Sequence, residues 1–254
     1  MDYLSISDAQ QQTGLRLVLT RGVPGPWSEA AKAVLDLRHV AYQAVKQQGG
    51  RKNLDLVAWT GHRNAPIALY NGEPPRVRWL EILDLAERLG SGESLVPKAL
   101  DARIFMVGLI NEIAGERGFA WNARLLMLNA GYEAQGPEVI DKNPMYHEYQ
   151  YDAGQVSLAR QRVIDFLDFL TAHIKAQASR GSAFLVGDQL TAADAYWACF
   201  SNMLQSLPAA QNPMPDGLRR SWAVLAKSID GYDPVLIHQR DMTYAQHLKL
   251  PLDF

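Results

Sequence analysis

The sequence predicts a small α/β domain followed by a larger all-helical domain. Residues 1–90 alternate short apolar runs with amphipathic helical patterns, in the order β-α-β-α-β-β-α. Residues 90–98, GSGESLVPK, are polar and rich in glycine and serine, which is typical of a linker. After residue 96 the apolar residues recur at helical spacing. We therefore expect one domain at 1–90 and a second at 96–254, with 91–95 as the linker.

The first half of the α/β domain begins with the apolar run Leu15–Leu19, which predicts a strand. A helix is expected at Ser28–Arg38, with Ser28 placed to cap it. The extended segment Val40–Lys46 follows so closely that it predicts a β-α-β unit with a parallel strand pair. A second, short helix is expected at Asn53–Thr60.

The second half of this domain contains a predicted hairpin and a helix. Ile67–Tyr70 has the composition of a strand, and Asn71-Gly72 is a strong hairpin signal. Arg76–Arg78 is then expected to return antiparallel. The helix LEILDLAERL follows and ends before Gly90.

The second domain is expected to consist of helices. Leu100–Glu116 should turn Ile104, Val107, Ile110 and Ile113 toward a core. Residues 131–150 are expected to form a loop, and the tail from residue 230 is less regular. Further helices are expected at Asn122–Asn129, Val156–Ala178, and near 191–206 and 216–229.

Composition excludes several classes of function. The formal net charge is −2 without long runs of one sign, so neither a nucleic acid nor an anionic membrane is an expected partner. No apolar stretch reaches the length of a membrane helix, and the N-terminus does not resemble a signal peptide. Cys199 is the single cysteine, which favours a reducing compartment, and we expect a cytoplasmic protein. The six histidines are scattered, so no metal site is predicted.

Residues 184–198, FLVGDQLTAADAYWA, contain a helix start. Thr191 precedes a helical pattern and Asp194 stands three residues later, which is the spacing of a capping box. We expect this box to be structural.

The same stretch, with the domain order, resembles the glutathione S-transferase superfamily. That family has a folding signature G-D-x-L-T-x-A-D in its helical domain, and a proline in the cis form before its third strand, here Pro66. The signature residues are Gly187, Asp188, Leu190, Thr191, Ala193 and Asp194. The resemblance implies a thioredoxin-like N-terminal domain, a homodimer, and glutathione as the cosubstrate.

The resemblance also implies where glutathione binds. The backbone of Ala65, before Pro66, would pair with the cysteinyl part. The family's Glu/Gln-Ser/Thr pair for the γ-glutamyl carboxylate falls on Arg78-Trp79, or on Glu81-Ile82 if the preceding turn is three residues longer. Arginine can bind a carboxylate, but neither register supplies the serine. A surface charge at Arg78 and a packing role for Trp79 are the alternatives.

The resemblance leaves several candidates for the residue that activates the glutathione thiol. The family's tyrosine position falls on Leu19, Thr20 or Arg21, and its serine or cysteine position holds Gly25. Ser28 is a candidate hydroxyl donor or an ordinary N-cap, and Arg21 is a candidate guanidinium donor or a surface charge. Trp27 either forms a wall of the pocket or packs between the domains.

The second substrate of such proteins lies against the first helix of the helical domain. This comparison selects Met106, Ile110, Asn111 and Trp121, although core packing is the alternative for each apolar one. Two functions remain open: a glutathione transferase-like enzyme that joins glutathione to a small electrophile or removes it, and a non-catalytic ligand-binding or regulatory protein of the same fold.

Overall fold

A computed structural model describes all 254 residues and divides them into two compact units. Unit 1 comprises Met1–Leu95, Ala209–Met214 and Lys249–Phe254, and unit 2 comprises Val96–Pro208 and Pro215–Leu248. The predicted fold class is confirmed, because unit 1 combines a small mixed sheet with helices and unit 2 is helical. The segments Ala209–Met214 and Lys249–Phe254 belong to unit 1 in the structure, although the sequence analysis assigned them to the helical domain at 96–254.

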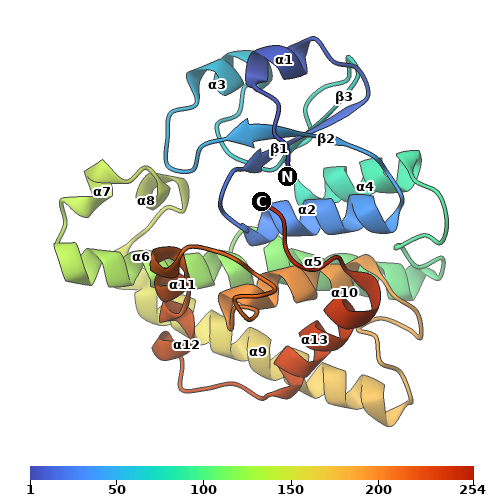
Figure 1. Cartoon of the computed structure of the whole chain (residues 1–254). Coiled ribbons are helices and arrows are strands. Elements are labelled where there is room, and N and C mark those ends of the chain that lie inside the picture. The colour runs from blue at the N-terminus through green and yellow to red at the C-terminus, as the bar shows by residue number, and fades with distance from the viewer. The chain divides into compact units, whose positions relative to one another are not determined.

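The sheet of unit 1 has three strands in the order β2-β1-β3 (Figure 1). β1 (Leu15–Thr20) is central, with β2 (Gln43–Gln47) parallel to it and β3 (Ile67–Tyr70) antiparallel. A central strand is covered on both faces, which explains why Leu15–Leu19 is a continuous buried run. The predicted return strand at Arg76–Arg78 is reduced to one bridge between Arg76 and Ala68, because Pro74 and Pro75 have no N–H to donate to a ladder.

Four helices accompany the sheet: α1 (Ile6–Gln10), α2 (Pro26–Leu37), α3 (Leu54–Thr60) and α4 (Trp79–Leu89). Apolar residues from α1, α3 and all three strands share one core cluster. α2 begins two residues before the predicted start, because Pro26 occupies the first helical position, for which its fixed φ is suited. Gly25 is the N-cap, so the prediction that Ser28 caps this helix is wrong.

A buried arginine joins the C-terminal ends of α2 and α4. The Arg38 guanidinium donates to the carbonyls of Ser91 at 3.0 Å and Gly92 at 2.9 Å, and also to that of Glu93. Its Nε lies 3.2 Å from the carboxylate of Glu87 on α4. A cation at two helix C-termini is favourable because the helix dipoles place negative charge there.

Gly90 permits this junction because of its small size. A Cβ at this position would lie 2.5 Å from the Arg38 Cβ and 2.7 Å from the Arg38 carbonyl oxygen. The two helices contact each other and both end at this junction, and they run in the same direction, as Figure 1 shows.

Unit 2 contains the remaining helices. They are α5 (Leu100–Ala114), α6 (Phe119–Gln135), α7 (Val139–Lys142), α8 (Met145–Glu148), η1 (Ala153–Gln155), α9 (Val156–Ser179), α10 (Ala192–Phe200), η2 (Ser201–Met203), α11 (Asp216–Trp222), α12 (Val224–Ser228) and α13 (Val235–His247). None of the chain's helices is long and apolar enough to cross a membrane.

Three expectations for this unit are wrong. Residues 131–150 contain the end of α6 and the whole of α7 and α8, not a loop. Buried packing of Leu128, Val139 and Tyr146 stabilises these helices, although the segment contains two prolines and many polar residues. Ile104 is 64% exposed, since α5 turns Met106, Ile110 and Ile113 inward instead. The tail beyond residue 230 contains the helix α13.

The predicted capping box is present at the start of α10. The fully buried Asp194 accepts hydrogen bonds from the Leu185 N–H at 2.8 Å and from the N–H and hydroxyl of Thr191, both at 2.9 Å. Burial raises the pKa of Asp194, and these hydrogen bonds oppose that rise. The box therefore fixes the loop before α10 to the first turn of the helix.

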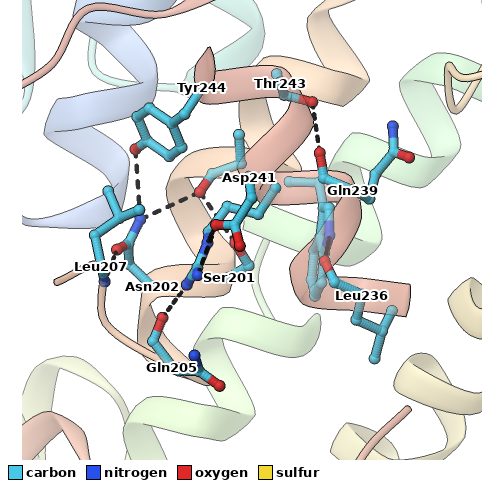
Figure 2. Close-up of polar contacts among 12 residues, drawn as sticks. Ser201, Asn202, Gln205, Leu207, Leu236, Gln239, Asp241, Thr243 and Tyr244 are labelled. Carbon is cyan, nitrogen blue, oxygen red and sulfur yellow. Dashed lines mark hydrogen bonds and ion pairs between the residues drawn. The ribbon is translucent and has the colours of Figure 1, made fainter. Parts of the chain in front are cut away.

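Polar contacts anchor α13 against η2 (Figure 2). The Asn202 amide donates to the Tyr244 hydroxyl at 3.4 Å and accepts from the Leu207 N–H at 3.0 Å. The buried Arg240 donates to the Gln205 carbonyl. A buried face this polar gives no clear apolar period, which explains why the sequence did not predict α13.

Replacement of Gly90 by alanine should destabilise the protein by about 2 kcal/mol, because the added methyl group overpacks the Arg38 junction. Urea denaturation measures this change. Gly72→Ala is the matched control, since a Cβ there has no neighbour within 4 Å. Equal stability of the two variants would contradict the proposed role of Gly90.

Candidate functional site

One end of the unit 1 sheet collects the predicted site residues. β1 ends at Thr20, and α2 starts six residues later with Pro26. Val18 is paired with Ile67 in the antiparallel register, so Pro66 lies beside the last residues of β1. The turn that contains Trp27 and Ser28 and the segment that contains Ala65 therefore lie at the same end of the sheet.

The first turn of α2 presents backbone N–H groups without a side-chain cap. Gly25 cannot supply a capping oxygen, and the first intrahelical bond runs from the Glu29 N–H to the Gly25 carbonyl at 2.9 Å. The N–H groups of Trp27 and Ser28 precede that bond and point toward the N-terminal end. Such a helix start attracts an anion through its N–H groups and its dipole.

The start of α4 has a similar form. Arg78 is the N-cap residue, and its guanidinium has no acceptor atom with which to cap the helix. The Glu81 carboxylate accepts from the N–H groups of Val77 and Arg78, each at 3.1 Å. Glu81 is thus engaged as a cap. The Arg78 side chain is exposed and has no hydrogen-bond or ion-pair partner.

The Arg38 junction places these two helix starts at the same end of unit 1. α2 and α4 are 12 and 11 residues long, so their lengths differ by only about 1.5 Å. Since they end together and run in the same direction, Trp27 and Ser28 lie at the same end as Arg78 and Trp79.

Ala65 and Pro66 complete this end of the unit. The peptide bond between them is cis. Both residues are half-buried, and Ala65 packs against the core cluster that contains Ile67. The backbone of Ala65 is thus held next to the buried start of β3.

The polar and charged side chains near the start of α2 differ in their environments. Ser28 is buried, with 4% of its surface exposed, whereas Arg21 is exposed in the preceding turn. Glu29 is also buried, and Lys32 donates to both of its carboxylate oxygens at 2.9 Å. Burial raises the pKa of Glu29, which Lys32 opposes. The Glu29–Lys32 ion pair was not predicted from the sequence, although its i, i+3 spacing is the usual signal for an ion pair on a helix.

The four predicted second-substrate residues lie in unit 2 in different environments. Met106 and Ile110 are fully buried, while Asn111 is exposed. Trp121 is half-buried and its ring lies 4.7 Å from that of Tyr149. The burial of Met106 and Ile110 on α5 corresponds to the core alternative for both.

One cavity of unit 1 lies away from the two helix starts. It has a volume of about 580 Å³ and is lined by residues at the end of α2 and the start of β2, including Asp36 and Tyr42. No group of three or more His, Cys, Asp or Glu side chains is placed to hold a metal ion.

Comparisons with known proteins agree with this fold. Residues 139–215 match the family described as glutathione S-transferase, C-terminal domain. No curated protein sequence matches the chain. Solved structures match most of its length at low identity.

Three of these structures illustrate the similarity. The β-etherase LigF from Sphingobium sp. strain SYK-6 is 16% identical with a TM-score of 0.64, over 92% of this chain and 96% of that one. A Methylobacterium radiotolerans glutathione S-transferase in complex with glutathione sulfonate is 15% identical with a TM-score of 0.62, over 92% of each chain. A Pseudomonas fluorescens glutathione transferase family member with bound glutathione is 14% identical with a TM-score of 0.60, over 92% and 97%.

The chain therefore has the glutathione S-transferase fold, and the predicted resemblance to that superfamily is confirmed. The match of the C-terminal family model covers the start of α10, where the capping box lies.

Replacement of Glu81 by alanine should destabilise the protein by about 1 kcal/mol, because the N–H groups of Val77 and Arg78 lose their acceptor. Urea denaturation is again the measurement. Asp84→Ala removes an exposed carboxylate from the same helix and should change stability by less than about 0.5 kcal/mol. If the two variants were equally stable, Glu81 would not be the cap.

Proposed function

We propose that this protein is a glutathione S-transferase-like enzyme that joins glutathione to a small electrophile or removes it from a conjugate. The observation that carries the proposal is the placement of two helix starts and the Ala65 backbone at one end of unit 1. Glutathione carries a thiol and two carboxylates, so it has anionic groups suited to helix N-termini.

In this proposal the thiol lies at the start of α2. The N–H groups and dipole of α2 favour the thiolate over the thiol, which lowers the pKa of the bound thiol. Ser28 is the first candidate donor to the sulfur, because it lies in the first turn of α2 and does not cap the helix. Arg21 is the second candidate, since it is exposed in the turn just before α2.

The start of α4 would hold the γ-glutamyl carboxylate. Arg78 has an unpaired guanidinium at the N-cap of α4, and a guanidinium binds a carboxylate through two parallel hydrogen bonds. It would replace the serine that the family uses. Glu81 would support this site by fixing the backbone of Arg78, and Trp27, Pro66 and Trp79 would form its walls.

The solved structures support glutathione as the ligand, since two of those described above contain glutathione or its sulfonate. We further propose a homodimer, a reducing compartment such as the cytoplasm on account of the single buried Cys199, and no metal requirement. Asn111 and Trp121 are the better candidates for second-substrate contacts, because Met106 and Ile110 are buried.

A non-catalytic binding protein of the same fold is the second candidate. It is favoured by the absence of a hydroxyl or thiol at Gly25 and by the engagement of Glu81 as a cap. Such a protein would bind a ligand without activating a thiol.

Calorimetric titration with millimolar glutathione, combined with ultraviolet absorbance of the thiolate, tests the proposed function. We expect saturable binding and thiolate formation near neutral pH. Ser28→Ala should raise the pKa of the bound thiol by about one unit if Ser28 is the donor, because one hydrogen bond to the thiolate is lost.

Arg21→Ala is the parallel variant and should produce that rise if Arg21 is the donor instead. Binding without thiolate formation would favour the non-catalytic protein. The absence of both heat and thiolate would rule out glutathione as the ligand.

Arg78→Ala should weaken glutathione binding roughly tenfold, because the carboxylate loses a charged, bidentate partner. Arg78→Lys keeps the charge without the planar fork and should give an intermediate loss. Dissociation constants from calorimetry provide the measurement. Unchanged affinity in both variants would show that Arg78 is only a surface charge.

A further inference from the structure

The last six residues of the chain, Lys249–Phe254, form part of unit 1, and we refer to them as the C-terminal clasp. Lys249 pairs with Asp36 of α2 at 2.9 Å. Leu252 is buried and its N–H donates to the Gln211 carbonyl at 2.7 Å. The clasp is thus attached through apolar burial, a backbone hydrogen bond and an ion pair.

Asp253 connects the clasp to the middle of α2 and to the chain's other end. Its carbonyl accepts from the Lys32 ammonium at 2.6 Å, and its carboxylate pairs with the amino group of Met1. In Figure 1 both termini lie beside α2.

Lys32 is fixed by these contacts. An ammonium group has three N–H donors, and those of Lys32 have three acceptors: the two carboxylate oxygens of Glu29 and the carbonyl of Asp253. The Lys32 side chain is 10% exposed and that of Glu29 6%. Removal of the Asp253 carbonyl would leave one donor of a buried ammonium group unpaired, which is costly.

The Glu29–Lys32 pair matters for the proposed thiol site because of its place in α2. Glu29 follows Ser28 directly and makes the first intrahelical hydrogen bond. An uncompensated carboxylate there would repel an anion at the helix start, and low surrounding polarity would strengthen that repulsion. Lys32 cancels this charge while it stays on Glu29.

Other ionisable groups also lie near this pair. Burial and the charges of Glu29 and Asp253 raise the pKa of the Tyr3 phenol to about 12, and the charge of Arg21 opposes that rise. Asp36 and Asp253 act on Glu29 as well. Release of the C-terminal clasp would thus also change the electrostatic environment of Arg21.

We propose that the C-terminal clasp regulates the anion site at the start of α2 by holding Lys32 on Glu29. The proposal rests on the proposed function, because the anion is taken to be the thiolate of glutathione. With the clasp docked, Glu29 is neutralised and the thiolate is favoured. With the clasp released, Lys32 can move toward water, and Glu29 opposes the thiolate.

The surroundings of the clasp allow it to leave without disruption of the core. Lys249 lines the open cavity of about 580 Å³, together with Met1 and Tyr42. Its side chain is 78% exposed. Leu252 is the clasp's one buried apolar residue, so a charge at that position should release the clasp selectively.

The test uses the full chain with Leu252→Asp, and digestion with a carboxypeptidase reports whether the clasp is released. We expect faster trimming of the variant, about fivefold weaker glutathione binding, and a rise of about 0.7 unit in the pKa of the bound thiol, which is fivefold on the pH scale. Lys249→Ala is the control, since an exposed ion pair contributes little.

Glu29→Gln separates an electrostatic role of the clasp from a merely structural one. In the Glu29→Gln background, release by Leu252→Asp should no longer raise the pKa of the bound thiol, because the repelling charge is absent. A rise of the same size in both backgrounds would overturn the proposal. If Leu252→Asp does not release the clasp, a chain that ends at Leu248 takes its place in the same comparison.

The outcomes distinguish this inference from the proposed function. If the unaltered chain binds glutathione and a released clasp leaves both affinity and thiol pKa unchanged, only the role of the clasp is overturned. If the unaltered chain binds no glutathione, the proposed function and the regulatory role of the clasp are both overturned.

Discussion

The buried guanidinium of Arg38 determines how the candidate site of unit 1 is built. It draws the carbonyls after α4 and the carboxylate of Glu87 onto the end of α2. Because two helices of similar length are joined at their C-terminal ends, their N-terminal ends must also lie together. The site at one end of the sheet therefore depends on a contact at the other end, and Gly90 is the residue that lets this contact close.

Buried polar groups fix the helix ends in both units. Asp194 ties the start of α10 to the preceding loop, and Arg240 and Asn202 hold α13. In unit 1, the Lys32–Glu29 pair does the same for the C-terminal clasp. The helix starts at Pro26 and Trp79 lie at the same end of unit 1, near the backbone of Ala65. This placement is why we propose ligand binding at those two starts.

Much of the fold could be predicted from local pattern. The strand Ile67–Tyr70, the helix before Gly90 and the capping box at Thr191 all follow from periodicity and turn chemistry. The start of α2 could not be located to the residue, because Ser28 has the composition of an N-cap while Pro26 sets the actual start. α13 could not be predicted because its buried face contains Gln239, Arg240 and Thr243, whose partners come from elsewhere in the chain.

The candidate site could be predicted only in part for a similar reason. The motif positions of Ala65, Pro66 and Arg78 follow from sequence spacing. The engagement of Glu81 with two backbone N–H groups, and the burial of Met106 and Ile110, depend on contacts that only the folded chain defines.

We propose that glutathione binds at the two helix starts joined through Arg38. Backbone amide chemical shifts of isotope-labelled protein, followed through a glutathione titration, test it most directly. We expect saturable shifts at Trp27, Ser28, Ala65, Trp79 and Leu80, with one dissociation constant for all five. Shifts confined to other parts of the chain, or five amides that do not respond at millimolar glutathione, would contradict it.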